Sequence, residues 1–349
     1  MMPGAHAPAM QEIAVVSCAD ENYAMPLAVT IRSMLDSLRR DCRVRLFILD
    51  GGITPASQAR LVASWKDSRL TVEFLRPDVD LVRDLPVSEH ISAAAYLRLL
   101  MPSLLPAEVS RVIYLDADML VRRDLAELWA EEQGGFAALA VQDLAAPYFN
   151  AETSIPGFDD KKKHLAAFTP IANYRELCLS PANKYFNSGL MVIDVAQWRR
   201  DRIGDQVLNC LREHREHVLW WDQYALNVVL AERWRALDLQ WNQGVHVYIC
   251  RNWTESWLDR ATFTQLRKAP WIVHFCSPAK PWHYFCRHPF TGEFRRSLRQ
   301  TAWRDWRPAP PERLLSKWWD FYYRPVRNEW KTQVRALKKA VRGDKRRAA

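Results

Sequence analysis

Short apolar runs alternate with segments of helical period along the first 145 residues of the chain. The apolar runs have the length of strands, and we predict strands at 13–18, 44–49, 70–75, 111–115 and 136–142. The segments between them predict helices at 26–38, 55–65 and 96–105. This alternation is typical of a mostly parallel sheet with helices on its faces. The pattern therefore predicts an α/β fold of the nucleotide-binding kind.

The pattern becomes irregular and polar between 143 and 184, which indicates a surface excursion. Regular structure resumes at 187–195 and continues with predicted helices at 197–212 and 224–231. A late apolar run at 269–275 predicts one more buried strand. No segment of the chain repeats another, so a repeat architecture is disfavoured.

The composition fits a globular protein of one large domain or two ordinary ones. No run of eighteen apolar residues occurs, and the first ten residues lack the basic and apolar regions of a signal peptide. We therefore expect no membrane-spanning helix and a cytoplasmic location. The seven cysteines are scattered and form no CxxC pair, which disfavours both a disulfide framework and a zinc site.

The formal charge of +9 is concentrated near the C-terminus. Residues 311–349 contain twelve Lys or Arg against four Asp or Glu, interleaved with aromatic residues. Within 331–342, Val334, Leu337 and Val341 fall on one helical stripe between basic side chains. Basic amphipathic segments bind the headgroups of anionic membranes, so we predict that this tail lies on the inner face of the cell membrane. A solvated terminus is the alternative, and nucleic-acid binding is disfavoured because no nucleic-acid motif accompanies the charge.

Polar side chains follow three of the predicted strands. Asp20 and Asn22 come after the first strand, Asp116 and Asp118 after the fourth, and Asp143 after the fifth. In open α/β sheets ligands collect at the carboxyl ends of the strands, so these residues are candidates for a binding site. None of the turns carries a glycine-rich phosphate loop, which disfavours a dinucleotide fold and a P-loop.

Asp116 and Asp118 form a candidate metal site. In an extended backbone, residues two apart project to the same side, so the two carboxylates can converge while Ala117 faces the other way. A single Asp at a strand end is commonly a turn or capping residue, but a pair at the end of a buried central strand favours a divalent cation. Two hard carboxylates suit Mn²⁺ or Mg²⁺.

A second cluster follows the late strand, in the stretch HFCSPAKPWH at 274–283. A lone histidine in that place is more often structural, but Lys280 follows His274 in a proline-rich loop that can hold a cation in place. A metal bound by two Asp and one His, together with Lys280, would neutralise a diphosphate. Neutralising a departing diphosphate is the Lewis-acid term that such a reaction needs.

Six stretches of the chain resemble those of glycosyltransferase family 8, in the order of the family. They are ADENY at 19–23, HIS at 90–92 with YLRL at 96–99, VIYLDADMLV at 112–121, FNSG at 186–189, WDQ at 221–223 and HFCSPAKPWH at 274–283. The family holds the bacterial lipooligosaccharide α-galactosyl- and glucosyltransferases. The resemblance implies a GT-A fold, a UDP-sugar donor with Mn²⁺, and retention of the anomeric configuration. It also implies a saccharide or glycolipid acceptor, such as the lipopolysaccharide core or another cell-surface glycan.

The resemblance implies roles for individual residues as well. It makes Asp116, Asp118 and His274 the metal ligands, and Gln223, Asp222 and Asp143 the catalytic residues. The residues implied to bind the sugar nucleotide are Cys18, Asp20, Asn22, Arg98, Asp116, Ala117, Asp118, Asn187, Ser188, Asp222, Gln223, Ser277 and Lys280. Gln223 is similar to the residue on the β-face of the reacting carbon. Because an amide is a poor nucleophile, this favours a same-face displacement over a covalent glycosyl-enzyme.

The chain departs from the family pattern at two places. Ser277 stands where the family usually has glycine, and a serine with positive φ would be strained there. The excursion that starts at Asp143 is longer than in the galactosyltransferase members and lies where the acceptor should bind. We expect a catalytic domain over 11–290 and a C-terminal helical, basic and aromatic segment over 291–349.

Two other interpretations of the same residues stay open. In a phosphohydrolase, Asp116 would be phosphorylated and Asp118 would act as general acid. Such enzymes prefer Thr or Val where this chain has Leu120, and they do not explain the stretches at 20–22 and 274–283. The second alternative is a non-catalytic peripheral membrane protein built on a nucleotide-binding fold.

Overall fold

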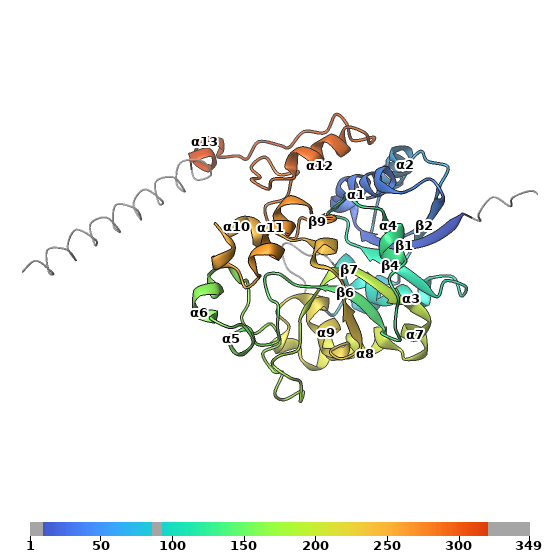
Figure 1. Ribbon diagram of the computed structural model, residues 1–349. Helices are drawn as coiled ribbons and strands as arrows, with labels where there is room; N and C mark the ends of the chain where they lie inside the picture. The colour runs from blue at the N-terminus through green and yellow to red at the C-terminus, as the bar shows by residue number, and fades with distance from the viewer. Residues whose placement is uncertain (1–9, 86–92, 320–349) are drawn as a thin grey trace, which may run out of the picture.

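The computed structural model describes residues 10–85 and 93–319, and its centre is a seven-stranded sheet (Figure 1). In sheet order the strands are β3 (Leu70–Leu75), β2 (Cys42–Asp50), β1 (Gln11–Ala19), β4 (Arg111–Leu115), β7 (Phe186–Asp194), β6 (Ala138–Gln142) and β8 (Trp234–Ala236). The first four strands are parallel, β7 is antiparallel to both of its neighbours, and β6 is parallel to β8. The predicted α/β fold with a mostly parallel mixed sheet is therefore confirmed.

Helices cover both faces of this sheet (Figure 1). One face packs against α1 (Ala24–Ser37), α2 (Pro55–Ser64) and α4 (Leu125–Trp129), and the other against α3 (Met101–Leu104), α7 (Val195–Arg200), α8 (Ile203–Glu213) and α9 (Trp221–Val229). Strand alternation separates the two cores, since Val15 belongs to the first cluster and Val16 to the second. Helix α2 begins as the sequence predicts, because Thr54 accepts a hydrogen bond from Ser57 and Pro55 occupies the first helical position.

Two predicted helices differ from the observed elements. The segment predicted as a helix at 96–105 is a 3₁₀ segment, η3 (Ala93–Leu100), followed by the single turn α3. The helix predicted at 197–212 is divided into α7 and α8, because Arg202 takes a left-handed conformation with φ of 52° between them. A periodic apolar pattern runs through both breaks, so periodicity alone could not place them.

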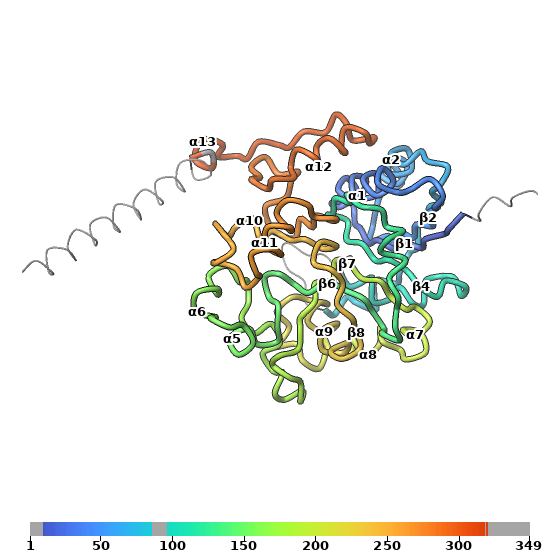
Figure 2. Tube along the Cα trace, viewed as in Figure 1, coloured from blue at the N-terminus to red at the C-terminus, as the bar shows by residue number. Residues whose placement is uncertain are grey.

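The excursion after Asp143 is largely irregular, as the sequence predicts. It contains α5 (Ala151–Ser154), α6 (Phe158–Lys161) and the 3₁₀ turn η4 (Lys162–His164). Figure 2 shows this segment beside the part of the chain that carries α10 (His246–Ile249) and α11 (Arg260–Lys268). One connection between the two is the pair of His164 and Glu255, with Nε2 and Oε2 3.0 Å apart. The excursion is therefore attached to the segment that carries α10 and α11.

Residues beyond 290 begin with α12 (Thr291–Leu298), which packs on α1. Phe294, Leu298 and Trp303 are buried in the same core cluster as β1, and α13 (Leu314–Trp318) follows. No helix among the described residues is long and apolar enough to cross a membrane. The amphipathic stripe predicted within 331–342 lies outside the described residues, as does the HIS motif at 90–92, and the division of the chain at 290 stays a prediction.

The remaining short elements connect these layers. Strands β5 (Met119–Val121) and β9 (Ile272–His274) form a separate antiparallel pair. The other 3₁₀ turns are η1 (Glu21–Tyr23), η2 (Val79–Val82), η5 (Arg215–His217), η6 (Leu239–Asn242) and η7 (Trp253–Glu255). Strand β9 lies within the apolar run predicted at 269–275, whereas β5 and β8 are too short for the sequence pattern to indicate.

Candidate active site

Asp116 and Asp118 lie in the short turn between β4 and β5. The turn is fixed through the backbone: Asp116 N donates to Gly189 O at 2.8 Å, and the Thr30 hydroxyl donates to Ala117 O at 2.8 Å. Thr30 belongs to α1, which is packed on the sheet. Helix α1 and strand β7 thus hold the turn from two sides and direct both carboxylates to the same point.

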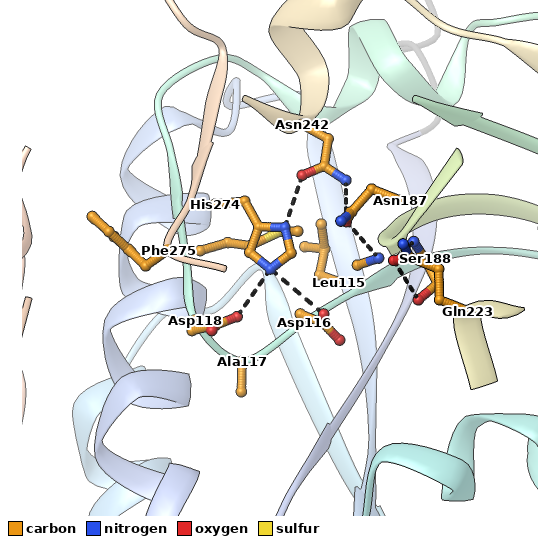
Figure 3. Close-up of polar contacts among 12 residues, drawn as sticks. Leu115, Asp116, Ala117, Asp118, Asn187, Ser188, Gln223, Asn242, His274 and Phe275 are labelled. Atoms are coloured by element: carbon orange, nitrogen blue, oxygen red, sulfur yellow. Dashed lines mark hydrogen bonds and ion pairs between the residues drawn. The ribbon is translucent and has the colours of Figure 1, made fainter. Parts of the chain in front are cut away.

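Pairing of β5 with β9 brings His274 to the two carboxylates. In the antiparallel register Met119 faces His274, and Phe275 N donates to Asp118 O at 3.0 Å. His274 Nε2 consequently lies 3.3 Å from Asp118 Oδ1 and 3.6 Å from Asp116 Oδ2 (Figure 3). The structure therefore brings together the three residues that the resemblance implies as metal ligands.

These three side chains fit a divalent cation. One ligand atom from each of Asp116, Asp118 and His274 lies within 4.8 Å of the others, and no other group of three His, Cys, Asp or Glu residues in the described ranges does so. A Cβ added at Gly189 would collide with the His274 ring and lie 2.7 Å from Asp116 Oδ2, so glycine leaves the space clear. Two carboxylates and one imidazole suit Mn²⁺ or Mg²⁺. When bound, such a cation would supply Lewis-acid stabilisation of a leaving phosphate.

Two cationic side chains flank the ligand group. Lys280 Nζ lies 2.6 Å from Asp118 Oδ2, and Arg98 Nη2 lies 3.0 Å from Asp116 Oδ1. Burial alone would raise the pKa of Asp118, but the ammonium of Lys280 holds that pKa below its usual range. Asp118 is therefore ionised at neutral pH, as a carboxylate that binds a metal must be.

Arg98 also connects the ligand group to α9. Its Nε lies 3.0 Å from Asp222 Oδ2, and its Nη1 donates to Ser188 O at 2.8 Å. Burial raises the pKa of Asp222 to about 6, even though the guanidinium opposes the shift. Trp221 adopts φ of 46° immediately before Asp222, a conformation that is costly for a bulky residue. This strained residue begins α9, and the two residues after it contact the site: Asp222 pairs with Arg98, and Gln223 accepts from Ser188 N.

Two side-chain amides, those of Asn187 and Gln223, surround Asp143. Asp143 Oδ2 accepts from Asn187 Nδ2 at 3.0 Å and from Gln223 Nε2 at 3.3 Å. Gln223 Oε1 in turn accepts from the backbone N–H of Ser188 at 3.0 Å. This contact fixes which way round the Gln223 amide lies, because a backbone N–H can only donate.

The residues that follow β1 lie beside the Asp116–Asp118 turn, because β1 is the neighbour of β4 in the sheet. Asp20 caps η1 by accepting from Tyr23 N at 3.1 Å, and Asn22 is exposed. The Tyr23 ring meets Trp282 edge to face, with centroids 5.9 Å apart, so this end of β1 contacts the loop that carries Lys280. Cys18 is buried beneath, and burial raises the pKa of its thiol, which therefore stays neutral. Ser277, in the Lys280 loop, has no positive φ, so the strain considered from the sequence does not occur.

Three residues of this site were not singled out from the sequence. Tyr114 donates its hydroxyl to Asp116 Oδ1 at 2.9 Å, and Gly189 provides the space described above. Asn242 lies at the end of η6 with its Oδ1 2.9 Å from His274 Nδ1. The segment around Asn242 has neither helical nor strand period, so only its position in space reveals it.

The same geometry agrees with comparisons to known proteins. The profile of glycosyl transferase family 8 matches residues 14–286. The chain is 32% identical to General stress protein A of Bacillus subtilis (strain 168), over 83% of this chain and 94% of that protein. It is 21% identical to a lipopolysaccharide 1,2-glucosyltransferase of Escherichia coli (strain K12), over 85% and 80% of the two chains.

Among solved structures, the galactosyltransferase LgtC in complex with donor and acceptor sugar analogues has the same fold. Its TM-score is 0.67 at 23% identity, and the match covers 87% of this chain and all of the other. The fold, the strand-end ligand group and the family profile agree with one another, and the resemblance noted in the sequence is confirmed. The chain belongs to glycosyl transferase family 8 and is a glycosyltransferase with a GT-A fold.

Proposed function

We propose that this enzyme moves a hexose, galactose or glucose, from a UDP-sugar to a saccharide acceptor, with retention of anomeric configuration and with Mn²⁺ or Mg²⁺ as cofactor. One observation carries the proposal: Asp116, Asp118 and His274 converge at the carboxyl end of the sheet, between two cationic side chains. This distribution of charge matches a metal-bound diphosphate. The glucosyltransferase relative and the galactosyltransferase of similar fold support the two candidate sugars.

The proposed roles follow the positions of the side chains. Asp20 and Asn22, at the end of β1, bind the uracil and ribose beside Cys18. Arg98 and Lys280 bind the diphosphate, and the backbone at Ala117, Ser188 and Ser277 lies along it. Asn187, Asp222 and Gln223 line the sugar pocket, and Asp143 lies where donor and acceptor meet.

Lys280 has a distinct part in this scheme. Its ammonium contacts Asp118 and the carbonyl of Phe275, each at 2.6 Å. A bound cation would take over the charge of Asp118, and the ammonium can then turn to a phosphate oxygen of the leaving group. Lys280 would thereby neutralise Asp118 in the metal-free enzyme and the departing diphosphate when the cation is bound.

Retention is proposed to proceed by same-face displacement. Gln223 is held by Ser188 and Asp143 and is an amide, so it is a poor candidate for a nucleophile. A diphosphate oxygen on the reacting face would accept the proton of the acceptor hydroxyl as the glycosidic bond forms and the bond to the diphosphate breaks. The chain's own side chains bind and orient the two substrates around that exchange.

The acceptor is proposed to be the lipopolysaccharide core or another cell-surface glycan, reached at the inner face of the membrane. Support comes from the basic tail and from Leu314, Leu315 and Trp319 in and beside α13, which are 37%, 84% and 48% exposed. Removing residues 315–349 should move the enzyme from the membrane to the soluble fraction. Unchanged partitioning would contradict this part of the proposal.

The chemical proposal is tested with purified enzyme, a panel of UDP-sugars and added Mn²⁺. We expect slow hydrolysis of one UDP-hexose that stops when the metal is chelated, and an α-linked product by NMR when a saccharide acceptor is supplied. Phosphatase activity without use of any UDP-sugar would instead support the phosphohydrolase. That alternative is disfavoured because Asp116, its required nucleophile, is engaged by both Arg98 and Tyr114.

A further inference from the structure

A continuous chain of side-chain hydrogen bonds connects Asp143, which is proposed to lie where donor and acceptor meet, to Nδ1 of His274. Asn187 Nδ2 donates to Asp143 Oδ2 at 3.0 Å, and Asn242 Nδ2 donates to Asn187 Oδ1 at 2.9 Å. Asn242 Oδ1 then lies 2.9 Å from His274 Nδ1 (Figure 3). All four side chains lie on the same edge of the fold, but they come from four separate segments of the chain.

The direction of this chain is fixed by a group that can only donate. The backbone N–H of Gly189 donates to Asn187 at 3.1 Å, so the atom of Asn187 that faces Gly189 is its oxygen. The Asn242 atom that faces the same oxygen must then be the NH₂ group, which turns the oxygen of Asn242 toward His274. An amide oxygen can only accept, so Nδ1 of the His274 ring carries a proton.

We infer that Asn242 is a positioning residue that sets the tautomer of His274, so that the lone pair of Nε2 faces Asp116 and Asp118. The inference deepens the proposed function and rests on it, because the lone pair is useful there only for a metal ion. A neutral ring with its proton on Nδ1 has nothing to donate to the two carboxylates 3.3 and 3.6 Å away. Three acceptors then converge on one point, which a cation fills.

Asn242 is itself held firmly in relation to the histidine. It ends η6, which Asp238 caps by accepting from Gln240 N at 2.8 Å, and its own side chain is buried. The next residue, Gln243, pairs with β9 through two backbone hydrogen bonds of 2.9 Å, one of them to His274 N. The amide and the imidazole therefore belong to adjacent, mutually bonded backbone segments, which keeps the distance between them constant.

Loss of the Asn242 amide would free the other tautomer. A proton on Nε2 would occupy the lone pair that the metal needs, and the N–H could be donated to Asp118. Removing a partner of this kind from a ligating histidine typically lowers metal affinity by about 10–100-fold. We expect Asn242→Leu to weaken Mn²⁺ binding by an amount in this range.

The tautomer can be measured directly in metal-free wild-type protein. NMR of protein labelled with ¹⁵N in histidine distinguishes a protonated from an unprotonated ring nitrogen, and His274→Gln identifies the signals that belong to residue 274. We expect Nδ1 protonated and Nε2 unprotonated in the wild type, and a mixture or the reverse in Asn242→Leu. A neutral wild-type ring that is protonated on Nε2 and not on Nδ1 would overturn the inference, and this outcome requires no variant of Asn242 to fold.

Metal affinity gives the second readout, with Gln240→Leu as the matched control. Gln240 lies on the same 3₁₀ turn, is equally buried, and bonds only to Ala269 and Gln265 through its amide, away from His274. Titration with MnCl₂ alone, followed by the EPR signal of free Mn²⁺, should show weaker binding in Asn242→Leu and unchanged binding in Gln240→Leu. Equal losses in the two variants would reduce Asn242 to a structural role. Absence of Mn²⁺ binding in the wild type would contradict the proposed function instead.

Discussion

Two buried histidines line one cavity of this enzyme, and their surroundings are opposite. His274 and His246 are 4% and 1% exposed, so burial does not distinguish them. His274 has an amide at Nδ1 and two carboxylates at Nε2. His246 has the backbone carbonyl of His164 at Nδ1, 3.3 Å away, and the Ser256 hydroxyl at Nε2, 3.1 Å away.

The difference shows what separates a proposed metal ligand from a structural histidine. Both nitrogens of His246 meet neutral groups that complete a neutral imidazole, and burial lowers its pKa to about 4. The ring thereby joins the excursion to η7 without any need for a further partner. At His274 one nitrogen faces two anions, an arrangement that a metal ion balances.

Asp118→Asn should have the largest effect on the difference between the two histidines, because it leaves the His274 ring in place but removes one of the two negative charges that this ring faces. An amide cannot replace a carboxylate as a hard anionic ligand, and loss of metal stabilisation costs several kcal/mol in the transition state. We expect Mn²⁺-dependent turnover of the UDP-sugar to fall by about 10³-fold, measured by release of UDP. Turnover within tenfold of wild type would mean that the carboxylate does not bind the metal.

The sequence predicted the parts of this site that follow strand ends. Asp116 and Asp118 were found because an acidic pair ends an apolar strand, and His274 because it ends a late apolar run. The sheet was predicted for the same reason, since β1, β2 and β4 carry their burial in continuous apolar segments. Each of these signals comes from residues that are neighbours in the chain, and a single sequence shows such neighbours directly.

Residues that act through register could not be predicted in the same way. Asn242 meets His274 only because the chain at Gln243 pairs beside β9, and β9 pairs with the three-residue strand β5. Nothing near Asn242 in the sequence indicates either pairing. The role of Gly189 is likewise visible only as the space that its missing side chain leaves next to His274.

Exchanging the two histidines for alanine sharpens the comparison. His274→Ala should lower Mn²⁺ affinity by more than about 100-fold, beyond the effect of residues that only support a ligand. His246→Ala should leave that affinity unchanged and lower the free energy of unfolding by about 2–4 kcal/mol, through a cavity and an unpaired Ser256 hydroxyl. Mn²⁺ titration and urea denaturation of both variants measure the two effects. Loss of metal binding in His246→Ala would show that the two rings are not independent.

Acid titration of stability tests the neutral state of His246. In the folded state the pKa of His246 is about 4, whereas the unfolded value is 6.5. As the pH falls between these values, the unfolded chain takes up a proton that the folded state excludes. Stability should therefore fall over this range, by up to about 3 kcal/mol from this residue. His246→Leu should show a shallower decline, measured as the slope of the free energy of unfolding against pH. If the curves of variant and wild type run parallel, the pKa of His246 is not lowered in the folded state and the prediction is wrong.

Gly189→Ala probes the space between His274 and the carboxylates with a single methyl group. Its Cβ would collide with the His274 ring and lie 2.7 Å from Asp116 Oδ2, so the ligand atoms must move apart. We expect Mn²⁺ affinity to fall by about tenfold, since a displacement of a few tenths of an ångström is enough to spoil a metal geometry. Gly292→Ala is the matched control, because nothing lies within 4 Å of a Cβ at that position in α12. If Gly189→Ala loses Mn²⁺ affinity and Gly292→Ala does not, the effect lies in the space beside His274. His246 has neutral surroundings, so the acid titration of stability should be unchanged in both variants.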